Sequence, residues 1–147
     1  MAAVQELLES LVAAAKAENW DDVDKVYIPR LAVSDDSDFV IYDWIVGEGL
    51  TDRNPHVRDA AASLFVSYHL KANSVPAFRI RKGHDRLLFV MQTDKNQYAR
   101  YRAAFALDEH KLCEGNSDEV LLLIQTLRKA TADNDVGNIA QERLKKY

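Results

Sequence analysis

Two stretches of this sequence, TDRNPHVRDAAASLF at residues 51–65 and TDKNQYARYRAAFAL at residues 93–107, decide the fold. Aligned with each other, they share six residues at a constant offset of 42 positions. The matched pairs are Thr51/Thr93, Asp52/Asp94, Asn54/Asn96, Arg58/Arg100, Ala61/Ala103 and Ala62/Ala104. A period of about 40–47 residues is typical of proteins built from repeated helix pairs. The sequence therefore predicts two equivalent units that follow each other along the chain.

Each stretch carries apolar residues at helical spacing, so that they share one helix face. The stripe that begins in the first stretch consists of Val57, Ala60, Ala61, Leu64, Phe65 and Tyr68, and the stripe that begins in the second consists of Ala99, Ala103, Ala106, Leu107 and His110. Asn54 and Pro55 mark the start of the first helix, because an asparagine side chain caps free N–H groups and proline suits the first helical position. Both stripes are predicted to face the core.

Similar stripes fill the rest of the chain, and no stretch alternates apolar and polar residues long enough to predict a strand. We therefore expect an all-α protein of eight helices joined by short polar turns. Asp21 is expected to cap the second helix and Pro29 to kink or end it. Asp38 is expected to open the third helix, over residues 39–50, and the carboxylates of Asp35, Asp36 and Asp38 are expected to cap its free N–H groups.

The later helices also have start signals. Ser74 and Pro76 predict a fifth helix that runs to about residue 92, with Gly83 as a weak point inside it. Asn116 and Glu119 have the spacing of a capping box before the seventh helix. The last helix is predicted from the apolar residues Val136, Ile139, Ala140 and Leu144.

The composition is that of one globular domain. The chain has 147 residues, of which 48% are hydrophobic and 29% charged, and this excludes a disordered tail and a membrane protein. Its single cysteine excludes an internal disulfide and a multi-thiolate metal site, and fits a reducing compartment. The N-terminal stretch has no basic residues at its start and carries Glu6 and Glu9 among its apolar residues, unlike a secretory signal. We expect a soluble cytoplasmic protein.

The turn aspartate of the first stretch, followed by Asn54-Pro55-His56-Val57-Arg58 and a stripe of alanines, resembles the second helix of a HEAT repeat. The resemblance implies a short right-handed α-solenoid of about four antiparallel helix pairs. Its units are roughly residues 3–33, 38–72, 74–112 and 117–147. In this family the turn aspartate and the arginine of the second helix form a ladder between units. The resemblance gives this structural role to Asp52, Arg58, Asp94 and Arg100.

The sequence shows no constellation that would support catalysis, and we expect no enzyme, cofactor or metal ion. No His-Glu-x-x-His motif, glycine-rich phosphate loop or nucleophile elbow is present. His110 and Cys113 have the spacing to touch one metal ion, but two ligands fall short of the three or four of a zinc site.

Instead, the stripe opposite the predicted core suggests a protein-binding surface on the second helices of the repeats. It would form an apolar strip with a polar rim, which suits a protein partner of unknown identity. The candidate residues are Asp59, Val66, Tyr101, Arg102, Phe105 and Asp108. Alternatively, the aromatic residues among them fill the space between neighbouring helices.

A second hypothesis is the binding of an anionic ligand or a nucleic acid by a cluster of basic residues. The candidates are Arg79, Arg81, Lys82 and Arg86. Basic groups near tyrosines grip phosphates and stack on bases, but the net charge of −4 argues against nucleic acid and favours an acidic protein surface. A third hypothesis, from fold analogy alone, is an accessory factor for tetrapyrrole-bearing proteins. The oligomeric state stays open.

Overall fold

The computed structural model describes residues 2–69 and 74–147, and within these ranges the chain is helical and has no strand. The prediction of an all-α fold is thereby confirmed. The helical elements, with their bounds, are α1 (Ala2–Lys16), α2 (Trp20–Asp22), the π turn η1 (Val23–Tyr27), α3 (Ile28–Ala32), α4 (Val40–Gly47), the 3-10 turn η2 (Gly49–Thr51), α5 (Pro55–Ser67), α6 (Ala77–Thr93), α7 (Gln97–Glu109), α8 (Ser117–Ala130) and α9 (Gly137–Leu144). Residues 70–72 of the unit predicted at 38–72 lie outside the described ranges.

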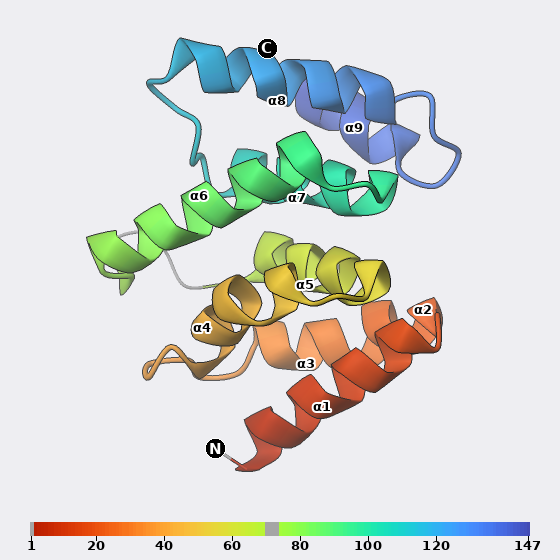
Figure 1. Ribbon diagram of the computed structural model, residues 1–147, viewed down its shortest axis with the longest axis vertical. Coiled ribbons are helices and arrows are strands. Elements are labelled where there is room, and N and C mark those ends of the chain that lie inside the picture. Colours follow the sequence, from red (N-terminus) through yellow and green to blue (C-terminus); the bar gives the residue numbers. More distant parts are fainter. Residues whose placement is uncertain (1, 70–73) are drawn as a thin grey trace.

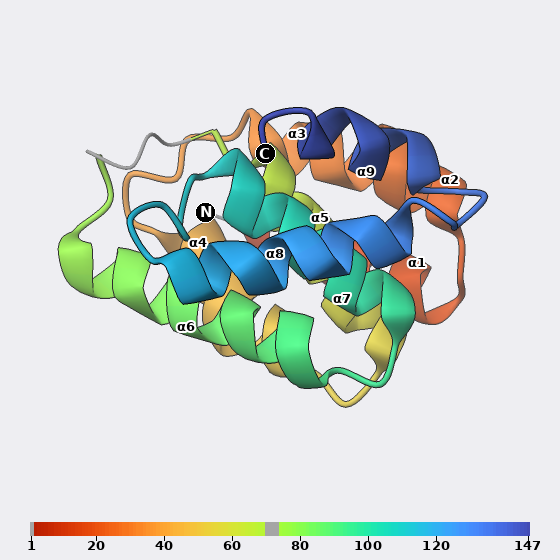
Figure 2. The same ribbon diagram turned by 90° about the horizontal axis from the view of Figure 1, so that it is seen from above.

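The helices follow one another in pairs along the long axis of the molecule. Figure 1 shows α1 with α2 and α3 at the bottom, then α4 with α5, then α6 with α7, and α8 with α9 at the top. Figure 2 looks along this axis, with α8 and α9 in front of the earlier pairs. The most extensive helix contacts join α5 to α7 and α6 to α7. Over the described ranges, no helix has the length and apolar character needed to cross a bilayer.

The two matched sequence stretches become α5 and α7, and their predicted stripes are buried except for His110, which is half-buried. Ala61 and Ala103 are fully buried. Small side chains at these positions allow neighbouring helices to approach closely, which is why the repeat is rich in alanine. The sequence therefore identified the core side of both helices.

The caps of α5 and α7 are equivalent. Asn54 Oδ1 accepts a hydrogen bond from the backbone N–H of His56 at 2.8 Å, and Asn96 Oδ1 accepts one from that of Ala99 at 3.0 Å. These bonds satisfy N–H groups that have no partner inside the helix. The predicted cap at Asn54 is confirmed.

Two other predicted helix starts are wrong. Asn19, not Asp21, caps α2, because its side chain accepts a hydrogen bond from the backbone N–H of Asp22. Of the three aspartates expected to cap α4, the buried Asp36 does so, but the helix does not open at Asp38. The Asp36 carboxylate accepts hydrogen bonds from the backbone of residues 41 and 42 at 2.7 and 3.0 Å, while Phe39 turns the chain with a φ of 59°. A backbone cap five residues distant along the chain leaves no simple spacing signal in the sequence.

Pro29 does not end the second helix, although it supplies no N–H for the helical hydrogen bonds. The helical path continues from Trp20 to Ala32, and the residues before the proline form the π turn, in which the N–H of Ile28 bonds to the carbonyl of Val23. A π turn holds one more residue than an α turn. Within this turn the rotation per residue is therefore smaller than in the rest of the helix.

Gly83 is a point of close approach rather than a weak point in α6. A Cβ atom added there would lie 2.5 Å from the hydroxyl oxygen of Tyr42 and 3.2 Å from the ring of Phe65. The Tyr42 hydroxyl donates a hydrogen bond to the carbonyl of Arg79 at 2.8 Å, so α4 and α6 meet through this contact. Only glycine leaves room for it.

The two last helices differ from their predictions in one detail each. Asn116 Oδ1 caps α8 through the N–H of Glu119 at 3.1 Å, but the Glu119 side chain bonds to another helix and does not close the capping box. On α9, Val136 and Ala140 are buried as predicted, whereas Ile139 is 44% exposed. As the last pair, α8 and α9 cover α7 on one side only.

Candidate functional site

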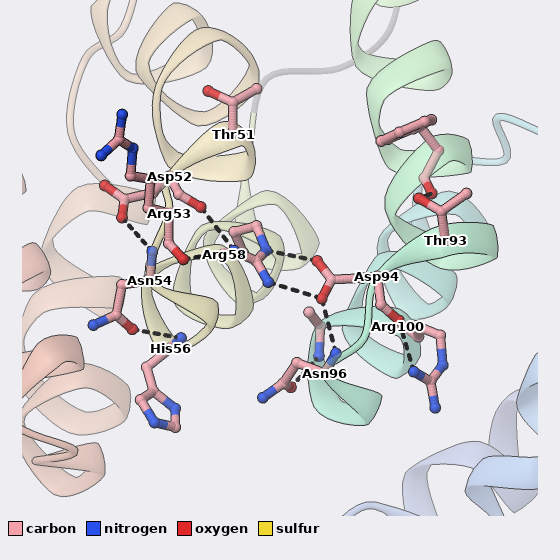
Figure 3. A network of polar contacts seen from close by, with 12 residues as sticks. Thr51, Asp52, Arg53, Asn54, His56, Arg58, Thr93, Asp94, Asn96 and Arg100 are labelled. Carbon is pink, nitrogen blue, oxygen red and sulfur yellow. Dashed lines mark hydrogen bonds and ion pairs between the residues drawn. The ribbon is translucent and has the colours of Figure 1, made fainter.

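The arginine predicted to link successive units reaches across to the next one. Figure 3 shows the guanidinium of Arg58 facing the carboxylate of Asp94, with Nε and Nη2 donating at 2.6 and 3.0 Å. Its Nη1 also donates to the carbonyls of Asp52 and Arg53 at 2.8 and 3.1 Å. Arg58 therefore joins the turn before α5 to the turn before α7, as a bidentate pair with a largely buried carboxylate.

The equivalent arginine in the next unit makes only part of this pattern. Arg100 Nη1 donates to the carbonyl of Asp94 at 2.7 Å, as Arg58 does to that of Asp52. Within residues 2–69 and 74–147, Arg100 pairs with no carboxylate. The Asp52 carboxylate accepts instead from the N–H of Asn54 at 2.8 Å. Of the four residues predicted to form the ladder, Arg58 and Asp94 form its link between units.

The predicted apolar strip on α5 and α7 does not form an exposed surface. Tyr101 is 8% exposed and Phe105 2%, because α7 is covered by α5, α6 and α8 together. Val66 is half-buried at the edge of the core. The alternative, in which the aromatic residues fill the space between helices, describes their positions. A stacked helix has neighbours on several sides, so its second apolar face is also buried.

The two aspartates predicted to form the rim of that strip are buried as well. Asp59 Oδ1 accepts a hydrogen bond from Arg102 Nε at 2.7 Å, which links α5 to α7. Asp108 accepts from Arg143, Lys146 and Tyr147, at 2.7, 2.7 and 2.5 Å. Burial alone would raise the pKa of Asp108, but these hydrogen bonds outweigh it and hold the pKa below its ordinary value. Both carboxylates join successive helix pairs.

The four residues predicted to bind an anion lie in different surroundings and make different contacts. Arg79 forms a bidentate pair with Asp43, at 2.9 Å for both bonds, and stacks 4.5 Å above the ring of Phe39. Arg81 and Lys82 are exposed on α6. Arg86 lines a cavity of about 510 Å³ at the ladder, together with acidic and apolar residues. The contacts do not join the four into one site.

A histidine of the same segment connects α6 to α8. His84 Nε2 lies 2.6 Å from Glu119 Oε1, and its Nδ1 lies 2.9 Å from Asp85 Oδ1. Burial lowers the pKa of His84, but the hydrogen bonds to the two carboxylates outweigh it, so that the pKa is raised above the ordinary 6.5. His84 is thus a pH-dependent link between two helix pairs.

The starts of α2, α5, α7 and α9 lie on the right-hand side of Figure 1. A groove of about 440 Å³ lies at these helix starts. We call it the polar groove. Each of the four helix pairs contributes at least one residue to it, from α2 and η1, α5, α7 and the turn before α9. It is lined by Glu18, Trp20, Asp24, His56, Asp59, Tyr98, Arg102 and Asp135.

Contacts within the polar groove join its walls. Trp20 meets His56 edge to face, with 5.7 Å between the ring centroids, and His56 Nε2 lies 3.5 Å from Glu18. Tyr98 donates a hydrogen bond to Asp135 at 3.2 Å. These contacts bridge neighbouring helix pairs, so the groove is a feature of the stack and not of one helix.

Two carboxylates of the polar groove, those of Asp59 and Asp24, are partly desolvated. Burial raises the pKa of Asp59, although its bond to Arg102 opposes this shift. Burial also raises the pKa of Asp24, again against the attraction of Arg102. One guanidinium therefore acts on two carboxylates, and each of them would be stabilised by a further cation.

Two of the predicted surface residues, Asp59 and Arg102, belong to this groove, and its other residues were not predicted. The helix caps give a sequence signal for these other groove residues. Asn19, Asn54 and Asn96 cap the second helices of the first three pairs, and Asp133 accepts from two N–H groups before α9 at 2.7 and 3.1 Å. The groove residues lie within a few positions of these caps.

The histidine and the cysteine that were considered as metal ligands both contact the hydrophobic core. His110 Nε2 lies 2.6 Å from the carbonyl of Phe65, and burial lowers its pKa. Cys113 is a buried free thiol whose pKa burial raises to about 11. Among the described residues, no group of three or more histidine, cysteine, aspartate and glutamate side chains has the geometry to hold a metal ion.

Comparisons of the sequence with protein-family models, with curated proteins and with solved structures found no significant match.

Proposed function

We propose that this chain is a HEAT-like α-solenoid of four helix pairs that acts as a non-catalytic protein-interaction module. One observation carries the proposal: a single groove receives side chains from all four successive helix pairs. Such a groove depends on the stacking of the pairs, and stacked repeats characteristically bind partners along a surface built from successive units. The binding surface is the polar groove, in place of the strip around Tyr101 and Phe105.

The shape and chemistry of the groove support a protein partner. Its two aromatic side chains, Trp20 and Tyr98, are half-buried and present ring surface beside charged groups. Aromatic residues beside charged groups are common anchors of protein interfaces. The ladder between Arg58 and Asp94 keeps two of the contributing helices in register, and this favours a preformed surface. The single buried thiol fits a reducing compartment such as the cytoplasm.

Site-specific photo-crosslinking tests the proposal. Benzoylphenylalanine would replace Tyr98 in the groove and, as a matched control, the exposed Phe89 on α6, in lysate of the source organism. We expect a defined protein adduct from position 98 only, suppressed by excess wild-type chain but not by excess Trp20→Ala. Equal adducts from both positions, suppression by Trp20→Ala, or adducts with nucleic acid alone would refute the proposal.

A further inference from the structure

The polar groove concentrates the negative charge of the molecule. Four carboxylates, from Glu18, Asp24, Asp59 and Asp135, line it together with one guanidinium, that of Arg102. With His56 neutral, this leaves three negative charges within one groove, whereas the whole chain has a formal net charge of −4. Charge of one sign inside a concave surface focuses the field and favours ligands of the opposite sign.

The groove already holds one cationic side chain of its own. Arg102 reaches from α7 to Asp59, whose side chain is 8% exposed. A guanidinium is thus accommodated on a carboxylate at the groove wall, in the geometry that a partner's arginine or lysine would need. The remaining carboxylates of Glu18, Asp24 and Asp135 are exposed. Arg102 attracts that of Asp24, whereas those of Glu18 and Asp135 contact His56 and Tyr98.

The aromatic side chains suit the same class of ligand. Trp20 on α2 and Tyr98 on α7 both line the groove, on opposite sides of α5 in the order of the helix pairs. Cations are attracted to the faces of tryptophan and tyrosine rings, and the long aliphatic stems of lysine and arginine also pack on them. Aromatic rings combined with carboxylates select cationic side chains over apolar or acidic ones.

We propose that the polar groove receives a lysine- or arginine-rich segment of a partner protein. Its cationic side chains bind the carboxylates of Glu18, Asp24 and Asp135 and contact the rings of Trp20 and Tyr98. This inference rests on the proposed protein-interaction function and names the chemistry of the partner. An acidic partner or a nucleic acid, which the basic residues of α6 would favour, is excluded from this groove by its charge.

The test uses Trp20 as its own reporter. Because Trp44, the other tryptophan, lies on α4 away from the groove residues, the variant Trp44→Phe leaves Trp20 as the single fluorophore. Octalysine and octaarginine peptides are titrated into this variant, with octaglutamate and a glycine-serine peptide as controls. We expect saturable quenching or a spectral shift with the basic peptides only, weakened when salt is raised from about 50 to about 500 mM.

Matched charge reversals separate groove binding from general attraction. Asp24→Lys with Asp135→Lys is expected to weaken binding of the basic peptides at least about tenfold. Glu48→Lys with Glu114→Lys makes the same change in net charge at exposed positions outside the groove lining and is expected to leave binding within about twofold. Urea unfolding of each variant shows that it is folded before binding is compared.

Two results would overturn the inference: no saturable binding of either basic peptide, or equal weakening by the groove and the control reversals. Tighter binding of octaglutamate would overturn it as well. These failures differ from failure of the proposed function. A protein adduct from position 98 without binding of basic peptides leaves the interaction module standing and removes only the basic partner.

Discussion

Replacing Arg58 by alanine measures how strongly the ladder couples two helix pairs. The guanidinium donates four hydrogen bonds, two to the Asp94 carboxylate and two to carbonyls of the preceding turn. Hydrogen bonds to charged groups contribute about 1.5–3 kcal/mol each. The side chain of Arg58 is 20% exposed and that of Asp94 is 4% exposed. After the substitution, water can therefore replace only part of the hydrogen bonds that the Asp94 carboxylate loses. We expect Arg58→Ala to lower the free energy of unfolding by about 2–4 kcal/mol.

Arg100 supplies a matched control, since it occupies the equivalent position in the next unit. Its bond to the Asp94 carbonyl repeats one of the four contacts of Arg58, and no carboxylate of the described ranges pairs with it. We expect Arg100→Ala to cost about 1 kcal/mol. The two variants remove the same side chain from the same helical position, so the difference between them reports the carboxylate pair and the second carbonyl.

Urea unfolding followed by circular dichroism gives both values, and a double-mutant cycle of Arg58→Ala with Asp94→Ala isolates the pair. The coupling energy is expected to be about 1–3 kcal/mol. Equal losses for the two arginine variants would refute the reasoning. So would a coupling energy below about 0.3 kcal/mol, the level expected for independent sites.

Further outcomes concern buried contacts. Gly83→Ala is expected to lower the free energy of unfolding by about 1–2 kcal/mol, because the added Cβ would meet the hydroxyl of Tyr42. Gly47→Ala should raise the free energy of unfolding by up to about 1 kcal/mol, because a Cβ there has nothing within 4 Å. Urea titrations that rank the two variants in the opposite order would contradict this. Asp108→Asn should cost about 3 kcal/mol at neutral pH. Because the native pKa of Asp108 is lowered, that difference from wild type should be present above its ordinary pKa and shrink as pH falls through the native one, and a constant difference down to about pH 2 would count against it. For His84→Gln the sign is reversed: the native pKa is raised, so the loss should be largest below about pH 6.5 and disappear as pH rises through the native pKa, measured by unfolding over that range.

The sequence predicted the fold where local chemistry repeats. Asn54 and Asn96 stand 42 positions apart and cap equivalent helices, and the alanines that follow them are buried in both. It counted Asp36 among the carboxylates that cap α4 but placed the start of that helix at Asp38, and it took Gly83, where a neighbouring helix pair decides, for a weak point. Helical periodicity describes one helix, whereas these two features depend on how the chain turns and what lies across it.

The polar groove was largely beyond sequence reasoning for the same reason. A helical wheel of α7 shows two faces, and the face opposite the first apolar stripe was expected to meet solvent. Tyr101 and Phe105 are buried because other helices cover that side, while Tyr98, three residues before Tyr101, reaches the groove. The positions that line the groove follow from the order of the helix pairs. Of the predicted residues, Asp59 and Arg102 were found because both bear charge at the edge of a stripe.

Because of the π turn at Val23–Tyr27, the number of residues in this helix matters for binding. The turn takes up one extra residue, so removal of one residue within it, such as the exposed Lys25, would restore ordinary α-helical winding and leave the segments on either side facing as they do now. Removal of one residue between Trp20 and the π turn would instead rotate Trp20 by about 100° relative to α3 and away from His56. The position of a deletion in this helix therefore decides whether the polar groove keeps its tryptophan, which makes the spacing before the π turn a marker for whether a related sequence keeps the same ligand.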